Sequence, residues 1–258
     1  MSDDHMNIQL LRNINRQMEE LIIESKIQTQ IENGVFTFSY GSEVIRFFLP
    51  FAGQDGIQSH ILRTANFYEE KALRLVAPLL GPTSTVVDAG ANIGNHTVYF
   101  KKVCNVKHVI SFEPIQTTFN ILLRNISENQ LSGVMPICSA LGAHEGGGSI
   151  SSFRSGKLGT ITLEENALGK LRIASIDSLE LPRLDFLKID VEGGQIDVLR
   201  GGEETIRRTR PLIMVEMRVG TDEFATGDEY LKSIAYKLKM KCSKADYIYE
   251  PIVQSVVK

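Results

Sequence analysis

A glycine-bearing turn gives the strongest chemical signal in the sequence, and it reads Asp88-Ala89-Gly90-Ala91-Asn92-Ile93-Gly94. It follows an apolar run and precedes an amphipathic one, as expected between a strand and a helix. Gly90 permits a tight turn and a close approach of a ligand to the backbone, and Gly94 permits close packing where the helix begins. Backbone N–H groups at such a turn can face an anionic or polar ligand. The glycine pair alone is equally compatible with an ordinary connection.

A carboxylate further along the chain favours ligand binding. Glu113 ends the next apolar run, close to the separation of about 20 residues from the glycine loop at which a ribose-binding carboxylate is expected. Pro114 ends that strand and fixes the following turn. Asn92 fills the middle position, where a dinucleotide-binding loop would favour a third glycine for its pyrophosphate. Asp88 would repel a pyrophosphate but could hold an ammonium group, directly or through water. We therefore predict S-adenosylmethionine as the cofactor.

A second group of acids lies in Lys188-Ile189-Asp190-Val191-Glu192-Gly193. Ligands in open α/β sheets bind beyond the carboxyl ends of the strands, and strand alternation would start Asp190 and Glu192 on one side. These acids could position a substrate hydroxyl, act as a base or share a metal, or one could cap the following helix. Glu216 ends the next strand on the same rim. We predict Asp190 and Glu192 as catalytic residues, with His96 as a third candidate because an ordinary histidine titrates near neutral pH.

Alternating strands and helices must position these residues. Such alternation predicts a parallel sheet with helices on both faces. The predicted strands lie at 85–88, 108–113, 134–138, 185–190 and 211–217, and the predicted helices at 66–80, 94–103, 115–129 and 194–208. The stretch 147–163 interrupts this rhythm as an inserted hairpin, a candidate lid with Arg154 and Lys157 at its tip. Residues 236–242 and 246–252 would close the sheet as an antiparallel pair.

The first 65 residues form a separate region in this interpretation. Residues 6–31 predict a helix capped by Asp3 or Asp4, 35–40 and 44–49 predict a hairpin, and 51–64 predict irregular chain. The helix carries an apolar stripe, so it could pack on its own domain or join two copies of the chain. Its polar face has mixed charge, which disfavours a membrane surface. We predict an extension at 1–65, for oligomerisation or as a lid, and a cofactor-binding domain at 66–258.

Six segments occur in the order seen in FkbM-type methyltransferases: DAGANIGNHT, SFEP, ICSALG, LRIASIDSL, FLKIDVEGGQIDVLRGG and IMVEMR. The sequence closely resembles that family over about residues 66–240. The resemblance implies the α/β fold of class I methyltransferases, with a Rossmann-like seven-stranded sheet ordered 3-2-1-4-5-7-6 and strand 7 antiparallel. The family is associated with O-methylation of sugars, lipid-linked glycans and polyketides. Gly194-Gln195 and His96 depart from its usual pattern, which leaves the substrate open.

The resemblance also implies contacts to the cofactor. Leu141 would cover the adenine ring, and a backbone N–H near Ser139 or Ala140 would meet a ring nitrogen. Glu69, within a Tyr-Glu pair, would bind the ammonium group. The complete predicted cofactor-binding set is Glu69, Asp88, Gly90, Asn92, Gly94, Glu113, Pro114, Ser139, Ala140, Leu141 and Asp190. The resemblance requires no metal, and we predict none.

The composition and the charge distribution disfavour several other classes of protein. The 258 residues have a formal net charge of -3, so no basic excess indicates nucleic acid. No apolar run approaches the roughly 20 residues that span a bilayer, and acidic residues stand where a signal peptide needs basic ones. Three cysteines far apart in the sequence argue against a disulfide framework and suit a reducing compartment. We therefore expect a cytoplasmic enzyme.

The predicted activity is S-adenosylmethionine-dependent O-methylation of a hydroxyl on a sugar, glycan or secondary metabolite. A nicotinamide-dependent oxidoreductase is one alternative, which the missing middle glycine disfavours. A non-catalytic cofactor-binding module that docks a partner through the N-terminal helix is another, which the acids on the rim disfavour. The predicted partners are a small-molecule or glycan acceptor and, through that helix, a second copy of the chain.

Overall fold

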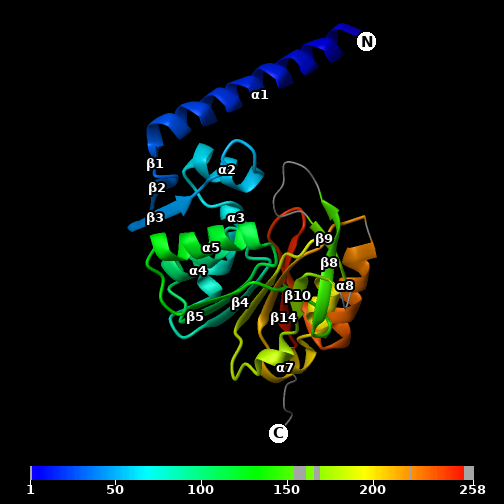
Figure 1. The fold of residues 1–258 in the computed structure, drawn as a ribbon. Coiled ribbons are helices and arrows are strands. Elements are labelled where there is room, and N and C mark those ends of the chain that lie inside the picture. The colour runs from blue at the N-terminus through cyan, green and yellow to red at the C-terminus, as the bar shows by residue number, and fades with distance from the viewer. Residues whose placement is uncertain (1, 154–160, 166–168, 221, 253–258) are drawn as a thin grey trace. The chain divides into compact units, whose positions relative to one another are not determined.

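The computed structural model describes residues 2–153, 161–165, 169–220 and 222–252. The chain divides into two compact units, Met1–Tyr68 and Glu69–Lys258, which we describe separately (Figure 1). In the described part of the chain, no helix combines the length and the apolar character needed to cross a membrane.

The N-terminal unit combines two helices with a small antiparallel sheet. Its elements are α1 (Ser2–Gln30), β1 (Ile31–Glu32), β2 (Val35–Tyr40), β3 (Glu43–Phe48) and α2 (Gly56–Thr64). The predicted hairpin is confirmed as β2 and β3, whose alternating aromatic residues provide the core. Phe38 and Phe47 lie edge-on to Phe67, with ring centroids 5.7 and 5.9 Å apart. Such aromatic contacts stabilise a sheet too small to hold itself.

Two expectations about this unit are wrong. The helix α1 already begins at Ser2, so Asp3 and Asp4 lie within it rather than capping it. The segment expected to be irregular contains α2. Asp55 caps this helix by accepting a hydrogen bond from the Gln58 N–H at 3.0 Å, and Ile61 and Leu62 give it a buried face. The capping residue was the signal that the sequence interpretation missed.

The second unit is built on a seven-stranded sheet. Its strands are β4 (Thr85–Ala89), β5 (His108–Phe112), β6 (Val134–Ile137), β11 (Phe186–Ile189), β12 (Leu212–Glu216), β13 (Tyr236–Lys241) and β14 (Asp246–Pro251). They are ordered β6-β5-β4-β11-β12-β14-β13, and β14 runs antiparallel to both of its neighbours. In chain order this is 3-2-1-4-5-7-6 with strand 7 antiparallel, so the predicted class I methyltransferase architecture is confirmed.

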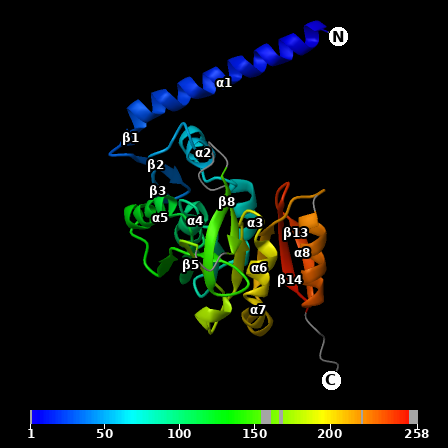
Figure 2. The ribbon, with the colours of Figure 1, turned by 45° about the vertical axis from the view of Figure 1, so that its right-hand side comes forward.

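Helices cover both faces of this sheet (Figure 2). They are α3 (Glu70–Val76), α4 (Asn95–Lys102), α5 (Gln116–Glu128), α6 (Gln195–Arg200), α7 (Glu203–Thr209), α8 (Asp222–Ser233) and the 3₁₀ turns η1 (Ala77–Leu79) and η2 (Asp177–Leu179). On one face Phe100 of α4 meets Phe186 of β11. On the other, Val198 and Ile206 pack in one core with Leu187.

The helices of the second unit depart from the predicted ones in three places. The helix expected at 66–80 begins only at Glu70, and α8 was not predicted. The helix expected at 194–208 is divided into α6 and α7 at Gly201-Gly202. A Cβ atom at Gly201 would lie 2.0 Å from the carbonyl oxygen of Gly142, so this backbone contact requires glycine.

A smaller sheet accompanies the large one. It comprises β7 (Ala140–Leu141), β8 (Gly146–Phe153), β9 (Ile161–Glu165) and β10 (Leu171–Ala174), in the order β7-β10-β8-β9. The antiparallel pair β8 and β9 confirms the strands of the inserted hairpin, whereas β10 was not predicted. Arg154 and Lys157, the expected tip of a lid, lie outside the described residues.

Candidate active site

The glycine loop joins β4 to α4 and lies directly against the chain that follows β11. The N–H groups of Gly90 and Ala91 donate to the carbonyl oxygen of Phe112 at 3.1 and 2.8 Å. Gly90 has a φ of +78°, and a Cβ atom there would lie 1.9 Å from the carbonyl oxygen of Asp190. Gly94, at the start of α4, has a φ of +89° and packs against Leu122. Both positions therefore require glycine, for conformation and for space.

Glu113 holds the glycine loop and the loop after β5 together. Its Oε2 accepts a hydrogen bond from the Asn92 N–H at 3.0 Å, and its Oε1 accepts one from the Ile115 N–H at 2.9 Å. Burial raises the pKa of this carboxyl to about 7, although both backbone hydrogen bonds oppose that rise. Each carboxylate oxygen can accept a further hydrogen bond, and the contact of Glu113 with ribose hydroxyls stays a prediction.

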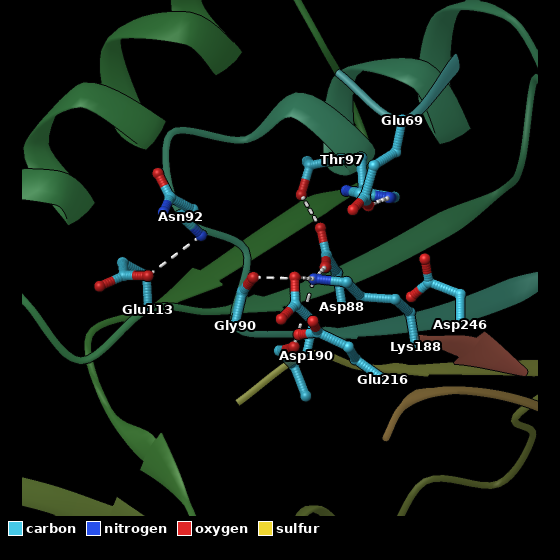
Figure 3. A network of polar contacts seen from close by, with 12 residues as sticks. Glu69, Asp88, Gly90, Asn92, Thr97, Glu113, Lys188, Asp190, Glu216 and Asp246 are labelled. Atoms are coloured by element: carbon cyan, nitrogen blue, oxygen red, sulfur yellow. Dashed lines mark hydrogen bonds and ion pairs between the residues drawn. The ribbon is translucent and has the colours of Figure 1, made fainter. Parts of the chain in front are cut away.

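A buried lysine lies at the centre of the polar network drawn in Figure 3. Lys188 Nζ donates a hydrogen bond to the Gly90 carbonyl oxygen at 2.8 Å, and it lies 3.3 Å from Asp88 Oδ1 and 3.4 Å from Asp190 Oδ2. Asp88 Oδ2 accepts a hydrogen bond from Thr97 Oγ1 at 2.7 Å. Asp88 is completely buried in this arrangement, so the structure does not favour its direct contact with a ligand. Its contacts instead fix α4 and Lys188.

Asp190 and Glu216 share a hydrogen bond between their carboxyl groups. Burial and the neighbouring Asp190 raise the pKa of Glu216 to about 9. Burial opposes ionisation of Asp190 as well, but Lys188 and the hydrogen bond with Glu216 hold its pKa below the ordinary value. At neutral pH Glu216 therefore carries the proton and Asp190 the charge. The Asp190 side chain is 36% exposed, so this charge can meet a substrate.

Glu69 and His96 form a second pair beside this network. Glu69 adopts a left-handed backbone, and its Oε2 lies 3.6 Å from His96 Nε2. Burial and the charges of Asp246 and Asp190 raise the pKa of Glu69 to about 8. Burial and Lys188 lower the pKa of His96 to about 4, so the expectation that it titrates near neutral pH is wrong. A desolvated imidazole beside a lysine cannot easily become cationic.

Glu192 follows the end of β11 and pairs with a different residue from Asp190. The strand β11 ends at Ile189, and the chain then turns at Glu192 and Gly193. Strand alternation therefore does not continue through these residues, and the expectation that it places both acids on one side is wrong. Glu192 Oε2 accepts a hydrogen bond from an Arg218 guanidinium nitrogen at 2.7 Å. Glu192 thus has a cationic partner of its own.

The stretch predicted to contact adenine is largely occupied by internal hydrogen bonds. The Ser139 N–H donates to the Ile137 carbonyl oxygen at 3.0 Å, so this N–H is not free for a ring nitrogen. Its hydroxyl lies 2.9 Å from the carbonyl oxygens of Ala140 and Arg172, to which it can donate. Ala140 and Leu141 are buried within β7. Pro114, also among the predicted cofactor-binding residues, lies next to Glu113 in the loop after β5.

Several members of the network were not among the predicted site residues. Thr97 lies in the first turn of α4, and Asp246 begins β14 beside Glu216 in the sheet register. Lys188 precedes Asp190 by two residues, which gave a local hint that the two could pair. The sequence offered no such hint for Asp246, because β12 and β14 are joined by a long excursion through α8 and β13.

The composition of the network suits a cationic cofactor. Five carboxyl groups gather around one buried ammonium group, and they belong to Glu69, Asp88, Asp190, Glu216 and Asp246. S-adenosylmethionine carries a sulfonium and an ammonium group and a ribose, for which Glu113 offers acceptors. The residues therefore fit this cofactor. Within the described ranges, no group of three or more histidine, cysteine or acidic side chains is placed to hold a metal.

Comparison with known proteins agrees with this chemistry. A family profile described as the methyltransferase FkbM domain matches residues 88–249. "Methyltransferase 1" of Beauveria bassiana is 26% identical over 184 residues, covering 61% of this chain and 74% of that protein. The hexuronic acid methyltransferase AglP of Haloferax volcanii is 28% identical over 159 residues, covering 60% and 64%, respectively.

A solved structure supports the fold. The methyltransferase FkbM from Methylobacillus flagellatus KT matches with a TM-score of 0.53 and 16% identity, over 94% of this chain and 59% of that one. This chain thus spans less than two thirds of that protein and of AglP. With its strand order, its glycine loop and its acidic network, the chain belongs to the FkbM methyltransferase domain family, and its methyl donor is S-adenosylmethionine.

Proposed function

We propose that this methyltransferase acts on oxygen, transferring the methyl group to a hydroxyl of a sugar, glycan or secondary metabolite. The observation that carries the proposal is Asp190, an ionised and partly exposed carboxylate beyond the carboxyl end of β11. Ligands of open α/β sheets bind at this end, so a hydroxyl could approach Asp190 there. The relative AglP, named for a hexuronic acid, supports a sugar acceptor.

The chain's own residues would divide the work of binding and orientation. Bound S-adenosylmethionine supplies a methyl group that its sulfonium already activates. Glu113 would accept hydrogen bonds from the ribose, and Glu69 would bind the ammonium group. Glu69 has a raised pKa in the structure, and a bound cation would favour its ionised form.

Asp190 would orient the acceptor and take its proton. Its carboxylate can accept a hydrogen bond from the attacking hydroxyl, and the proton would move to an Asp190 oxygen as the methyl group leaves sulfur for the acceptor oxygen. Lys188 keeps Asp190 ionised and contacts the Gly90 carbonyl oxygen as well. It would therefore fix the residue that orients the acceptor relative to the glycine loop. Orientation of this kind contributes much of the rate of a displacement reaction. Loss of Asp190 should therefore reduce methyl transfer without abolishing it.

Labelled cofactor and a panel of acceptors test the proposal. The panel includes hexuronic acid glycosides, neutral glycosides, hydroxylated polyketides and RNA, and NMR locates the methyl group in each product. We expect an O-methyl product from a sugar or small-molecule hydroxyl. Methylation of nitrogen, carbon or RNA instead would refute the proposal.

A matched pair of variants tests the role of Asp190 once an acceptor is known. Asp190→Asn should lower kcat by roughly 100- to 10,000-fold, the range of a positioned proton acceptor. Asp197→Asn changes an exposed carboxylate of α6 that pairs with Arg200, and it should leave kcat unchanged. Equal rates for both variants and the wild type would remove Asp190 from the mechanism.

The remaining proposals concern the setting of the enzyme. We infer a reducing compartment, the cytoplasm, because Cys104, Cys138 and Cys242 are free thiols. The net charge of -3 favours a small molecule or glycan over nucleic acid as the acceptor. The N-terminal unit would serve as an oligomerisation element or as a lid.

A further inference from the structure

A buried histidine in the first turn of α4 carries a ring nitrogen without a hydrogen bond. His96 is 5% exposed, and its ring lies beside that of Phe100, with 6.0 Å between the ring centroids. In the described part of the chain, its Nε2 atom has no hydrogen-bond partner. Such an atom costs stability and is rare in native proteins. It is therefore a candidate for a hydrogen bond that forms when a ligand binds.

The carboxyl group of Glu69 lies just beyond hydrogen-bond distance of this nitrogen. Its Oε2 atom is 3.6 Å from His96 Nε2, and both residues belong to the second unit. A shift of roughly half an ångström would bring the two atoms within hydrogen-bond distance. Hydrogen bonds in active sites are often long before the ligand binds and tighten in the complex. The side chain of Glu69 is 28% exposed, so a ligand can reach it while the histidine stays buried.

The backbone of Glu69 holds its side chain in this place. Its φ of +58° lies in the left-handed region, which is uncommon for residues other than glycine. The N–H groups of Ala72 and Leu73 donate to the Glu69 carbonyl oxygen at 2.9 and 3.1 Å and fix this conformation at the start of α3. Among the described residues, the Glu69 carboxyl makes no capping hydrogen bond to α3. Figure 3 shows the side chain pointing into the polar network instead. Strained backbone of this kind is concentrated at functional sites.

The charges around Glu69 decide which partner it needs. Burial and the carboxylates of Asp246 and Asp190 raise its pKa to about 8, although Lys188 opposes that rise. Before the cofactor binds at neutral pH, the carboxyl group therefore keeps its proton and can donate a hydrogen bond. A bound ammonium group would favour the ionised form, which can only accept hydrogen bonds. Glu69 thus needs a neighbour that can serve as acceptor in one state and as donor in the other.

A neutral imidazole can be that neighbour. One ring nitrogen accepts and the other donates, and the proton can reside on either of them. Burial and Lys188 lower the pKa of His96 to about 4, so the ring stays neutral. Its Nε2 atom could accept from the carboxylic acid of Glu69 and, after a change of tautomer, donate to the carboxylate. The ring would support the carboxylate without adding a positive charge that repels the ammonium group.

We propose that His96 is a positioning residue, whose Nε2–H donates to Glu69 when the cofactor binds and holds the carboxylate toward the ammonium group of S-adenosylmethionine. This role rests on the proposed contact between Glu69 and that ammonium group. It depends neither on the acceptor nor on transfer to oxygen, so it can be tested before any acceptor is known. It gives His96 a part in cofactor binding instead of proton transfer.

Titration calorimetry with two ligands tests this role in the full chain. S-adenosylhomocysteine carries the amino acid tail, whereas 5′-methylthioadenosine has the same nucleoside and sulfur without it. His96→Phe keeps a ring beside Phe100 and removes the ring nitrogens. It should weaken binding of S-adenosylhomocysteine by about 10-fold or more, as expected for the loss of a hydrogen bond to a charged group. Binding of 5′-methylthioadenosine should stay unchanged, whereas general damage to the site would weaken both ligands.

Two further variants are matched to His96→Phe. His96→Gln offers an amide N–H in place of the ring Nε2–H and should recover most of the lost affinity for S-adenosylhomocysteine. His108→Phe makes the same change at the exposed start of β5 and should bind both ligands as the wild type does. If His96→Phe binds S-adenosylhomocysteine as tightly as His108→Phe does, the positioning role is refuted.

A double-mutant cycle tests whether His96 acts through Glu69. Glu69→Gln should weaken binding of S-adenosylhomocysteine, and Glu69→Gln/His96→Phe should bind it no more weakly than Glu69→Gln alone. Additive losses would show that the histidine acts independently of Glu69 and would overturn the proposal. If Glu69→Gln binds like the wild type, the proposed contact of Glu69 with the ammonium group fails as well. A loss in Glu69→Gln without one in His96→Phe would refute only the role of the histidine.

Nitrogen NMR of the wild type tests the hydrogen bond without relying on any variant's stability. The protein is labelled with ¹⁵N in its five histidines, and the resonances of His96 are those lost in His96→Gln. With S-adenosylhomocysteine bound, we expect a neutral ring with its proton on Nε2, because an ionised Glu69 can only accept. 5′-Methylthioadenosine should leave the spectrum of His96 as it is without ligand. An unprotonated Nε2 or a cationic ring in the S-adenosylhomocysteine complex would overturn the proposal.

Discussion

Charged side chains usually face water and large apolar side chains are usually buried. The active site departs from the first half of this rule, and α1 departs from the second. Around the glycine loop, charged groups are withdrawn from water, so that Asp88 and Lys188 are both buried. On α1, large apolar groups remain in water, and Leu21 is 64% exposed. Buried charges and exposed apolar stripes both cost stability and need a compensating partner. The active site contains its compensating partners within one chain, whereas nothing in the described part of the chain covers the apolar side chains of α1.

Removing the central cation of the active site should have the largest effect. Lys188→Met leaves Asp88 buried without its cationic partner and removes the group that keeps Asp190 ionised. We expect a loss of about 3–5 kcal/mol in the free energy of unfolding, measured in urea. Lys232→Met breaks an exposed ion pair with Asp228 and should cost less than about 1 kcal/mol. Similar losses for the two variants would show that burial of the network is unimportant.

Filling the space at the loop should have the next largest effect. Gly90→Ala sets a methyl group against the Asp190 carbonyl and strains a backbone with a φ of +78°. We expect a loss of about 2–4 kcal/mol in stability and no stabilisation by S-adenosylhomocysteine in a thermal-shift titration. Gly81→Ala meets no atom within 4 Å and should retain the ligand response. Retained binding in Gly90→Ala would separate the loop from the cofactor site.

The proton on Glu216 gives stability a distinctive pH dependence. The pKa of this group rises from 4.5 in the unfolded chain to about 9 in the native protein. Between these values the native state binds more protons, so the stability that the group contributes falls as pH rises. Glu216→Gln keeps the hydrogen bond without the titration. Relative to the wild type, its stability should rise by about 1–2 kcal/mol from pH 5 to pH 8 in urea titrations. A constant difference would contradict the shared proton.

Removing an apolar group from the stripe should have the smallest effect on the folded unit. Leu21→Gln, studied under dilution that keeps the chain monomeric, should change the free energy of unfolding by less than about 0.5 kcal/mol. Leu187→Ala, in the core of the large sheet, should cost about 2–5 kcal/mol. If Leu21→Gln were as costly as Leu187→Ala, the stripe would be packed within the monomer, and the contrast with the active site would fail.

Local signals predicted most of the large sheet. Five parallel strands were expected from short apolar runs, and all five occur within about two residues of the predicted bounds. The capped helix α2, the division between α6 and α7, and the helix α8 were missed. Gly201-Gly202 shows why: a glycine pair is compatible with a helix interior until a second backbone segment, here Gly142, is found against it.

The candidate site was predicted less completely than the fold. Glu113 and the glycine loop followed from spacing, because consecutive parallel strands place their carboxyl ends together. The expectation that strand alternation places Asp190 and Glu192 on one side was wrong, because β11 ends at Ile189, before both acids. Asp246 lies near the C-terminal end of the sequence, and no motif around it predicted that it would belong to the site.

By itself the sequence determined the strand order through its resemblance to a known family, the glycine loop, the position of Glu113 at the end of the next strand and the apolar stripe of α1. These depend on spacing, periodicity or backbone conformation, which neighbouring residues define. Only the tertiary structure decided which carboxyl groups are ionised. It brought Lys188, Asp190, Glu216 and Asp246 together from three strand ends and withdrew them wholly or partly from water. The protonation state of a carboxyl group depends on its burial and on the charges near it in space, and neighbouring residues in the sequence predict neither.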